Sequence, residues 1–459
     1  MYVYCLCGLF LRLVFLLRQP KLCGRIFLVA TLFELQMRIS LLLLALFFPI
    51  SAISARDVWQ WRGADRTGVY SAETNLKKSW KEGEPRLLWH NSELGLGYSP
   101  PAIVNGVLYL SGTDEKTKRE IFYALSAKDG KTLWSLDYGN SWEKSYPSAR
   151  LTPTIVGGKA YVMSGSGEIA AIDLSAKKIL WTRDMMADYK GRPRDWGYAE
   201  NLVVFDGKVF MTVGGTKTAV VALDAESGRE VWLTKPVNKL AAYFSPIVVE
   251  MKNTTQIICG TIGLCFGIDV KSGEILWTQP LKKLGTGGFE HEKEWETNVA
   301  MPIFKEGRLF ISSGNNYGAY MLEIPDGRGE PKVVWTAPEF DTHHGGNILL
   351  NGRVYGSTWI NNEKGNWACY DWQSGAKIYD EPWPKHSKGS IVSADSMLYI
   401  YDELRGEIAL VNPASDKLDI VGTMRVKMGK GKHWCHPMIC DGVMYVRRGN
   451  VLMAYELKE

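Results

Sequence analysis

Histidine gathers in two short stretches of the sequence. Four of the seven histidines lie there, in HHGG at 343–346 and in HWCH at 433–436. Imidazole nitrogens are ligands for transition metals. The sequence places no carboxylate with His343 and His344, so this pair is more typical of a hydrogen-bonded structural feature than of a metal centre.

Other polar and aromatic residues recur at one place in a repeat that runs through the chain. A purely structural rim would need only small or apolar residues there. The sequence therefore predicts a polar pocket for a small, oxygen-rich or anionic molecule, and a solvated rim without a ligand is the alternative. The predicted ligand-binding residues are Arg150, Trp196, Tyr198, Glu200, Tyr243, Asn298, His343, His344, Lys388 and His436.

The repeat that must position these residues is clearest at 122–134, FYALSAKDGKTLW. Related segments end at Trp181, Trp232 and Trp277, and decayed copies end at Trp335 and Tyr379, so the unit recurs roughly every 50 residues. No stretch after the N-terminal leader shows a sustained 3.6-residue apolar period, which excludes helical repeats. Each final tryptophan can dock between neighbouring units, where a large flat ring buries much apolar surface.

Each unit reads as four short antiparallel strands. Asn105-Gly106 is a two-residue hairpin signal, and the same slot holds a similar pair in most units. Four strands in about 40–50 residues are typical of a propeller blade. The predicted first strands start near Pro101, Pro153, Leu202, Pro246, Pro302, Asn347, Ile391 and Pro437. The predicted fold is therefore an all-β, eight-bladed propeller.

One end of the repeat region lacks a strand, and the other end has one strand too many. The eighth unit stops after three strands, and RLLW at 86–89 looks like a last strand with no unit before it. Pairing the two would close the ring and remove an open sheet edge. All loops between consecutive blades would then meet on one face, so the predicted ligand-binding residues would circle the central channel.

The N-terminus reads as a leader. Met37-Arg38, an apolar run at 41–48 and small residues at 51–55 predict a signal peptide at 37–55, and the run is too short to span a membrane. Residues 1–36 are read as an over-extended start or an apolar leader, with an N-terminal membrane anchor as the alternative. The propeller domain is predicted at 56–459, and the protein is expected to be exported to the periplasm or beyond.

Charge and cysteine content exclude some functions. The leader holds five of the basic residues against Glu34, so the net charge of +5 falls close to zero without it. A near-neutral chain offers no electrostatic case for nucleic acid or an anionic membrane. The cysteines beyond the leader are Cys259, Cys265, Cys369, Cys435 and Cys440. Two local disulfides are conceivable, but buried thiols are the more typical reading, and no C-x-x-C motif suggests zinc or covalent haem.

The repeats resemble those of the pyrroloquinoline-quinone-like (PQQ-like) propeller family. The resemblance rests on the A-x-D-x-x-x-G-x-x-x-W pattern at 222–232 and its relatives, and it covers about residues 57–459. The opening WQWRGADRTGV, the HHGG and the WCHP at 434–437 look like a secreted bacterial subfamily. The family includes quinoprotein alcohol dehydrogenases, which hold PQQ and calcium on the axis, and cofactor-free scaffolds such as the outer-membrane assembly lipoprotein.

The resemblance therefore implies two functions. As a quinoprotein dehydrogenase, the chain would use Glu200, Asn201 and Asn298 as oxygen ligands for calcium, Arg150 or Lys388 toward the quinone, and Trp196 for stacking. The adjacent cysteine pair found in many such enzymes is missing. As a binding module, it would hold a small polar molecule, a glycan or an envelope protein on the same face. We expect the binding module, as a monomer, with PQQ dehydrogenase activity as the alternative.

Overall fold

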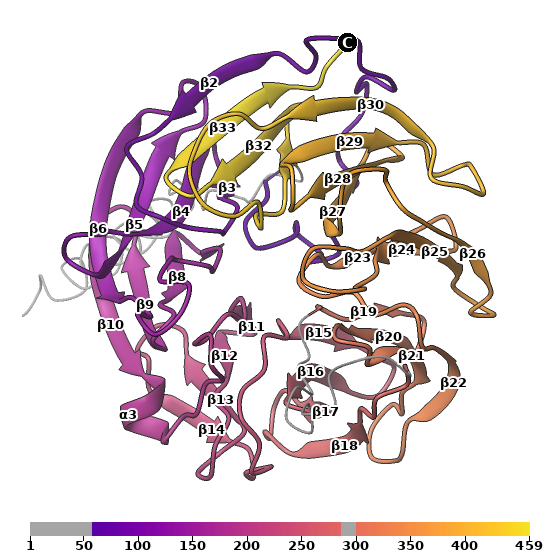
Figure 1. Cartoon of the computed structure of the whole chain (residues 1–459). Coiled ribbons are helices and arrows are strands. Elements are labelled where there is room, and N and C mark those ends of the chain that lie inside the picture. The colour runs from indigo at the N-terminus through magenta and orange to yellow at the C-terminus, as the bar shows by residue number, and fades with distance from the viewer. Residues whose placement is uncertain (1–56, 286–299) are drawn as a thin grey trace, which may run out of the picture. The chain divides into compact units, whose positions relative to one another are not determined.

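Eight antiparallel sheets form the described part of the chain. The computed structural model describes residues 57–285 and 300–459, all within one compact unit, Ile53–Glu459. The predicted leader and Asn298 lie outside the described residues. Each sheet is one blade of a β-propeller, with its first strand nearest the axis in Figure 1 and its last strand at the circumference. In this part of the chain, no helix is long and apolar enough to cross a bilayer.

The first four blades follow directly in chain order. Their strands are β3 (Ala102–Val104), β4 (Val107–Thr113), β5 (Arg119–Ser126) and β6 (Thr132–Asn140); β7 (Thr154–Val156), β8 (Lys159–Met163), β9 (Glu168–Asp173) and β10 (Lys178–Asp184); β11 (Val203–Phe205), β12 (Lys208–Thr212), β13 (Val220–Asp224) and β14 (Glu230–Leu233); and β15 (Ile247–Glu250), β16 (Thr255–Thr261), β17 (Leu264–Asp269) and β18 (Ile275–Pro280). One short helix, α3 (Met185–Tyr189), follows β10.

The last four blades complete the ring. Their strands are β19 (Ile303–Lys305), β20 (Arg308–Ser313), β21 (Gly318–Glu323) and β22 (Lys332–Ala337); β23 (Asn347–Leu350), β24 (Arg353–Ser357), β25 (Trp367–Asp371) and β26 (Lys377–Glu381); β27 (Gly389–Ala394), β28 (Met397–Asp402), β29 (Glu407–Val411) and β30 (Ile420–Arg425); and β31 (Met438–Cys440), β32 (Val443–Arg448), β33 (Val451–Glu456) and β2 (Leu87–Asn91). The first strands start within two residues of the predicted positions.

The N-terminal strand closes the ring as predicted. β2 pairs antiparallel with β33, with Trp89 opposite Ala454. Arg447 joins the same junction from β32, because its buried guanidinium donates to the carbonyls of Gly95, at 2.7 Å, and of Ser111 in blade 1. The two ends of the chain therefore share one sheet, and that sheet is fastened to blade 1.

Four of the predicted tryptophans dock between blades, whereas Trp277 donates its indole N–H to Gln256 of its own blade at 2.8 Å. Trp232 at the end of blade 3 donates its indole N–H to the Val270 carbonyl of blade 4 at 3.0 Å. Its ring lies against Gly273, where an added Cβ would come within 2.6 Å of the indole. Trp89, Trp181 and Trp335 make the same contact with the next blade. The glycine of the outer hairpin is required because a side chain there would displace the indole.

The segment before the first blade fills the channel rather than forming a simple surface entry. We call residues 57–73 the axial segment. Hydrogen bonds join it to inner strands of different blades: Ile103 donates to the Val58 carbonyl at 2.9 Å, and Ile155 donates to the Trp59 carbonyl at 2.8 Å. The end of the segment, β1 (Val69–Tyr70), pairs in parallel with β27 as a fifth strand of blade 7.

Two arginines link the axial segment to further blades through hydrogen bonds. Arg66 donates to the carbonyls of Asn201, at 3.0 Å, and Leu202, at 3.1 Å, before blade 3. Arg62 donates to the carbonyls of Asn347, at 2.6 Å, and Ile391, at 3.1 Å, in blades 6 and 7. Buried guanidinium groups are here stabilised by backbone oxygens, which keeps the axial segment fixed inside the ring (Figure 1).

The five cysteines of the propeller are buried thiols. Their apolar surroundings raise the pKa of the Cys369 thiol to about 11, with burial as the largest cause. The reading of these residues as ordinary core residues is confirmed, and the two conceivable local disulfides are not formed.

Candidate functional site

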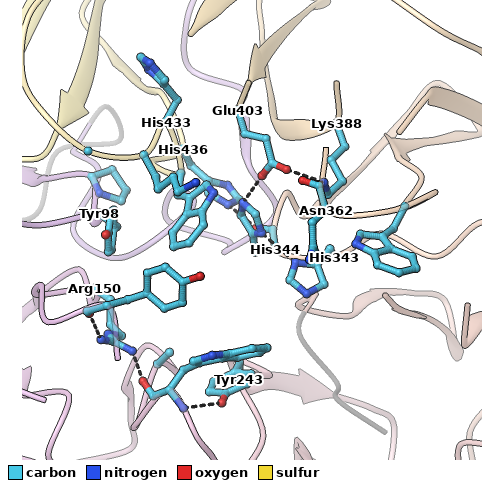
Figure 2. Close-up of a pocket in the computed structure, with 18 of the residues that line it drawn as sticks. Tyr98, Arg150, Tyr243, His343, His344, Asn362, Lys388, Glu403, His433 and His436 are labelled. Carbon is cyan, nitrogen blue, oxygen red and sulfur yellow. Dashed lines mark hydrogen bonds and ion pairs between the residues drawn. The ribbon is translucent and has the colours of Figure 1, made fainter. Parts of the chain in front are cut away.

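A pocket of about 720 Å³ opens on the face that carries the connections between blades. We call it the axial pocket (Figure 2). Its lining residues come from seven of these connections, from the second-to-third-strand regions of blades 5 to 8, and from the axial segment. Trp61 of that segment is part of the lining and packs against the core of blades 4 and 5. The pocket is thus closed on the side of the channel.

Most of the predicted ligand-binding residues meet in this pocket. The lining includes Arg150, Trp196, Tyr243, His343, His344, Lys388 and His436, together with Asn201, which is predicted only as a calcium ligand. Tyr198 and Glu200 are placed elsewhere: the Tyr198 hydroxyl donates to the Val213 carbonyl at 2.8 Å, and Glu200 accepts the Thr212 backbone N–H at 2.6 Å. Both side chains are buried among the blades.

Arg150 lies at the edge of the pocket and holds two connections together. Its guanidinium donates to the carbonyls of Tyr146, at 2.6 Å, and Trp196. Among the described residues, no carboxylate lies within ion-pair distance of this guanidinium. Burial lowers the pKa of Arg150, but the group remains a cation at neutral pH. It therefore brings a positive charge to the pocket that a bound anion could balance.

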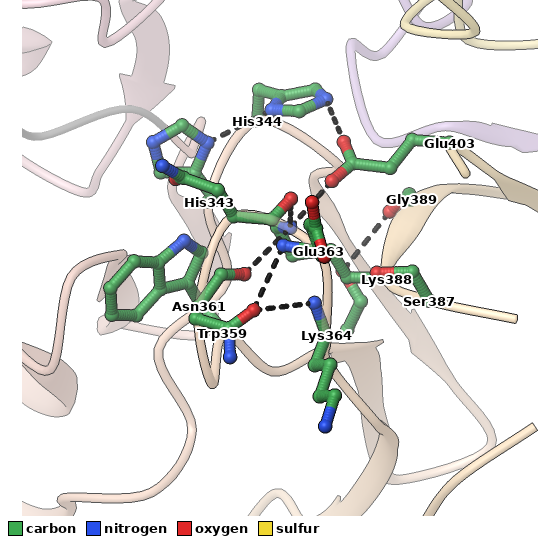
Figure 3. Close-up of polar contacts among 12 residues, drawn as sticks. His343, His344, Trp359, Asn361, Glu363, Lys364, Ser387, Lys388, Gly389 and Glu403 are labelled. Carbon is green, nitrogen blue, oxygen red and sulfur yellow. Dashed lines mark hydrogen bonds and ion pairs between the residues drawn. The ribbon is translucent and has the colours of Figure 1, made fainter.

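A chain of four charged or ionisable side chains crosses the opposite wall (Figure 3). His343 Nδ1 lies 2.9 Å from His344 Nδ1, and His344 Nε2 lies 3.0 Å from a Glu403 carboxylate oxygen. The other Glu403 oxygen lies 2.5 Å from Lys388 Nζ. Lys388 also donates to the carbonyls of Asn361 and Asn362, each at 3.0 Å. All three of its N–H bonds are thus used within the protein.

Glu403 is ionised in this setting. Burial opposes its charge, but the electrostatic influence of His344 and Lys388 and their hydrogen bonds outweigh burial and lower the pKa of Glu403 to about 2. Burial, and then the neighbouring His344, lowers the pKa of His343 to about 3, so His343 is neutral at pH 7. The sequence had placed no carboxylate beside the histidine pair. That reading was wrong, because blade 7 supplies Glu403.

His436 fixes the contact between the axial segment and the pocket. Arg62 donates to its Nδ1 at 3.0 Å, so the other ring nitrogen, Nε2, carries the proton and donates to the His344 carbonyl at 2.9 Å. Burial, followed by the charge of Arg62, lowers the pKa of His436 to about 3. The ring also meets Trp61 edge-on, with centroids 5.3 Å apart.

Aromatic rings cover much of the remaining lining. Trp434 meets Tyr98 and Tyr146, with centroids 5.2 and 5.0 Å apart. Trp196 and Tyr243 lie 5.4 Å apart in a second group, and the Tyr243 hydroxyl accepts the Trp196 backbone N–H at 3.1 Å. Such rings offer a flat apolar face together with a polar edge. The walls therefore combine aromatic surfaces with cations and amide groups.

The described part of the predicted calcium set does not form a calcium site in the axial pocket, because Glu200 lies outside the lining. The Asn201 side-chain oxygen accepts the Thr152 N–H at 2.8 Å, and its amide nitrogen donates to Ser245 at 3.1 Å. Burial raises the pKa of Glu200 to about 8, so this side chain is largely protonated at neutral pH. Within residues 57–285 and 300–459, no group of three histidine, cysteine or acidic side chains could hold a metal ion.

Two functional features escaped the sequence reasoning. Glu403 lies in the connection between β28 and β29, and the repeat frame pointed only to the connections between blades. Connections between second and third strands lie on the same face, so they offered the missing signal. Trp61 and Arg62 lie before the repeats, and nothing in their spacing showed that the segment runs through the channel.

Comparison with known proteins gives two groups of relatives. A family model described as outer membrane protein assembly factor BamB matches residues 64–176 and 117–381. The quinohemoprotein alcohol dehydrogenase ADH-IIG of Pseudomonas putida is 30% identical over 195 residues, which are 39% of this chain and 25% of that enzyme. BamB of Moranella endobia (strain PCIT) is 23% identical over 290 residues, which are 59% of this chain and 64% of that protein.

Solved structures show the same fold. The crystal structure of BamB from Moraxella catarrhalis has a TM-score of 0.57 at 13% identity, over 81% of this chain and 99% of that one. The structure of ADHIIG from Pseudomonas putida HK5 has a TM-score of 0.63 at 14% identity, over 88% of this chain and 80% of that one. At these identities the structural likeness concerns the fold alone. Together with the sequence matches, it shows that the chain belongs to the PQQ-like β-propeller family represented by the BamB model.

Proposed function

We propose that the protein binds a short saccharide, or a polar molecule of similar size, in the axial pocket. The observation that carries this proposal is a closed-ended pocket whose walls hold two aromatic groups with hydrogen-bonding side chains between them. A volume of about 720 Å³ is in the range of small-molecule sites. Sugar rings suit this lining because they present apolar faces to aromatic rings and hydroxyl groups to polar side chains.

The inferred location is supported by one sequence prediction and one comparison. The predicted signal peptide at 37–55 favours export, and the printed name of the BamB relatives refers to assembly at the outer membrane. We therefore infer that the protein works in the periplasm or outside the cell. A protein partner would contact the rim of the pocket rather than enter it, since a pocket of this volume holds a short chain of sugar units but no protein domain.

PQQ dehydrogenase activity is the second candidate, because quinoprotein alcohol dehydrogenases are among the relatives. The described residues do not fit its calcium ion well. The Asn201 oxygen already accepts a backbone N–H, Glu200 is buried away from the pocket lining, and the Glu403 carboxylate is paired with Lys388 and His344.

Calorimetric titration with a panel of mono- and oligosaccharides tests the proposal. A saccharide that binds the purified propeller should lose affinity about three- to tenfold when Trp434→Ala removes one aromatic wall. Trp181→Phe serves as the matched control, because Trp181 docks between blades 2 and 3 and lies outside the pocket lining. Absence of binding by the whole panel, or equal affinity in both variants, would refute saccharide binding in this pocket.

PQQ dehydrogenase activity, the second candidate, is tested separately. Purified protein is mixed with PQQ and calcium, and the absorbance spectrum is recorded together with dye-linked oxidation of alcohols. The proposed binding function predicts neither a bound quinone band nor turnover. A quinone band accompanied by turnover would establish the dehydrogenase instead.

A further inference from the structure

A second cleft, of about 500 Å³, lies beside the axial pocket between blades 7 and 8. We call it the basic cleft, after its lining residues Leu404, Arg405, Arg425, Val426, Lys427, His433 and Arg448. Arg405 belongs to the connection between β28 and β29, Arg425 ends β30, and Arg448 ends β32. Segments distant in sequence thus bring four cations to one cleft whose lining contains no acidic residue.

The cations of the basic cleft lack acidic partners within the described residues. Arg405 and Arg448 are each anchored through Nε alone, to the Lys385 carbonyl at 2.5 Å and to the Gly431 carbonyl at 3.1 Å. Their terminal guanidinium nitrogens therefore keep hydrogen-bonding capacity. Arg425 and Lys427 are exposed, and in the described part of the chain their side-chain nitrogens make no hydrogen bond or ion pair.

Nearby carboxylates are engaged elsewhere. Glu407 faces Arg425 across the β29–β30 pair, yet its carboxylate lies 2.9 Å from His386 Nε2. Asp402 accepts the backbone N–H groups of Ser387 and Arg405, each at 2.6 Å. Glu403 is held by Lys388 and His344. None of these carboxylates forms an ion pair with a cation of the basic cleft in the described part of the chain.

A buried histidine forms one side of the basic cleft. His433 is 7% exposed, and its Nδ1 lies 2.6 Å from the Tyr401 hydroxyl. Its ring lies against Gly406, where an added Cβ would come within 2.1 Å of the imidazole. Burial, followed by the charges of Arg448 and Arg425, lowers the pKa of His433 to about 4. Two of the cleft's cations thus lie close enough to act on one buried ring.

We propose that the basic cleft binds the sulfate or phosphate group of an anionic ligand. Guanidinium groups match oxyanions through paired N–H donors. Three of them together with an ammonium group exceed what a single carboxylate needs, and they suit a dianion with three or four oxygen atoms. This inference does not require the proposed saccharide site, because the cleft can take a free anion. If both sites function, the two pockets share Leu404, His433 and Arg448. The basic cleft can then hold an anionic substituent of the molecule bound in the axial pocket.

Titration calorimetry of the whole protein with sodium sulfate and sodium phosphate, at constant ionic strength, tests the proposal. Arg425→Gln and Arg448→Gln should each weaken binding about tenfold or more, because each removes a charged donor. Lys427→Gln, at an exposed position, should also weaken anion binding. Arg229→Gln is the matched control: it removes one positive charge from an exposed hairpin turn on the opposite face and should change nothing.

Further titrations separate the sources of the anion. Glucose 6-sulfate and glucose 6-phosphate are compared with glucose, and phosphatidylglycerol vesicles with phosphatidylcholine vesicles. The proposal is supported if the esters or the free anions bind and Arg425→Gln weakens that binding. If Trp434→Ala also weakens binding of the esters, the anionic group is a substituent of the molecule bound in the axial pocket. Undetectable binding of every anion, equal affinity in the arginine variants and the control, or binding to phosphatidylglycerol vesicles alone would overturn it.

Discussion

Glu403 is the residue on which the charged wall of the axial pocket depends. Its carboxylate is shared between Lys388 and His344, which come from connections that enter two different blades. The Lys388 and Glu403 side chains are only 4% and 8% exposed. A buried pair adds little net stability when it is intact, but removal of one partner leaves an uncompensated charge.

Glu403→Gln should therefore lower the free energy of unfolding by about 3 kcal/mol, because the Lys388 ammonium stays buried without its counter-charge. Urea denaturation at pH 7 measures the change. Glu363→Gln is the control: Glu363 also lines the pocket, but it is exposed, and its loss should stay within about 0.5 kcal/mol. Equal losses in the two variants would contradict the role given to Glu403.

Because two buried histidines have lowered pKa values, we expect the protein to be less stable in acid. His343 and His436 have folded-state pKa values of about 3, while the ordinary value is 6.5. Between these values the unfolded chain binds protons that the folded chain does not, so stability falls as pH drops from about 6.5 toward 3. Glu403, with its pKa lowered to about 2, adds to the loss below about pH 4.5.

Melting temperatures recorded from pH 7 to pH 4 should show this decline. His436→Asn should flatten the curve, because asparagine does not titrate and its carbonyl oxygen can still accept from Arg62. Glu200 acts in the opposite direction: its pKa of about 8 means that stability is lost as pH rises from about 4.5 through 8. A curve for His436→Asn that is as steep as that of the unaltered protein would show that His436 is already accessible to protons in the fold.

At the scale of the element, the contact between a final tryptophan and the next hairpin joins the blades. Each such tryptophan supplies one indole hydrogen bond and a large buried ring. The turn glycine adopts positive φ and also leaves room for the ring, so two separate requirements meet at one residue. Gly273 and Gly207 distinguish them: both have positive φ, at 75° and 68°, but only Gly273 lies against an indole.

Gly273→Ala should cost about 1 kcal/mol of backbone strain plus about 1–3 kcal/mol for the displaced Trp232 ring. Gly207→Ala should cost the backbone part alone, since nothing lies within 4 Å of the added methyl group. Chemical denaturation of the two variants gives the difference. If both lose the same stability, the indole contact does not contribute to the joint between blades.

At the scale of the whole molecule, two separate pieces of the N-terminal region complete the propeller. β2 covers the edge of blade 8, and the axial segment closes the channel beneath the pocket. Without β2, strand β33 would present unpaired backbone groups at an open edge, which favours aggregation. Without the axial segment, the ring would keep its eight sheets but lose their central hydrogen bonds.

Shortened chains distinguish the two pieces. Compared with a chain that starts at residue 56, one that starts at Lys81 keeps β2 and should remain monomeric, with a melting temperature lower by roughly 5–10 °C. A chain that starts at Pro101 lacks β2 as well and should aggregate. Size-exclusion chromatography and thermal melts report both outcomes. A stable monomer that starts at Pro101 would show that the ring does not depend on its closing strand.

Much of the fold followed from local patterns in the sequence. The Asn-Gly and Asp-Gly turns mark the hairpins because few other residues adopt positive φ there, and the final tryptophans fix the length of each blade. An eighth unit that lacks one strand, together with the isolated RLLW, leads to ring closure by simple strand counting. Seven of the predicted ligand-binding residues line one pocket because the repeat carries their connections to the same face.

The sequence by itself thus determined the architecture and the face that holds the site, because turns, strand alternation and repeats are local properties. Only the tertiary structure decided which residues meet across the axis. Glu403 reaches His344 from another blade, the axial segment places Trp61 in the pocket, and Arg405, Arg425 and Arg448 converge from separate connections. No local spacing records such contacts, since they depend on how eight sheets close around a common axis.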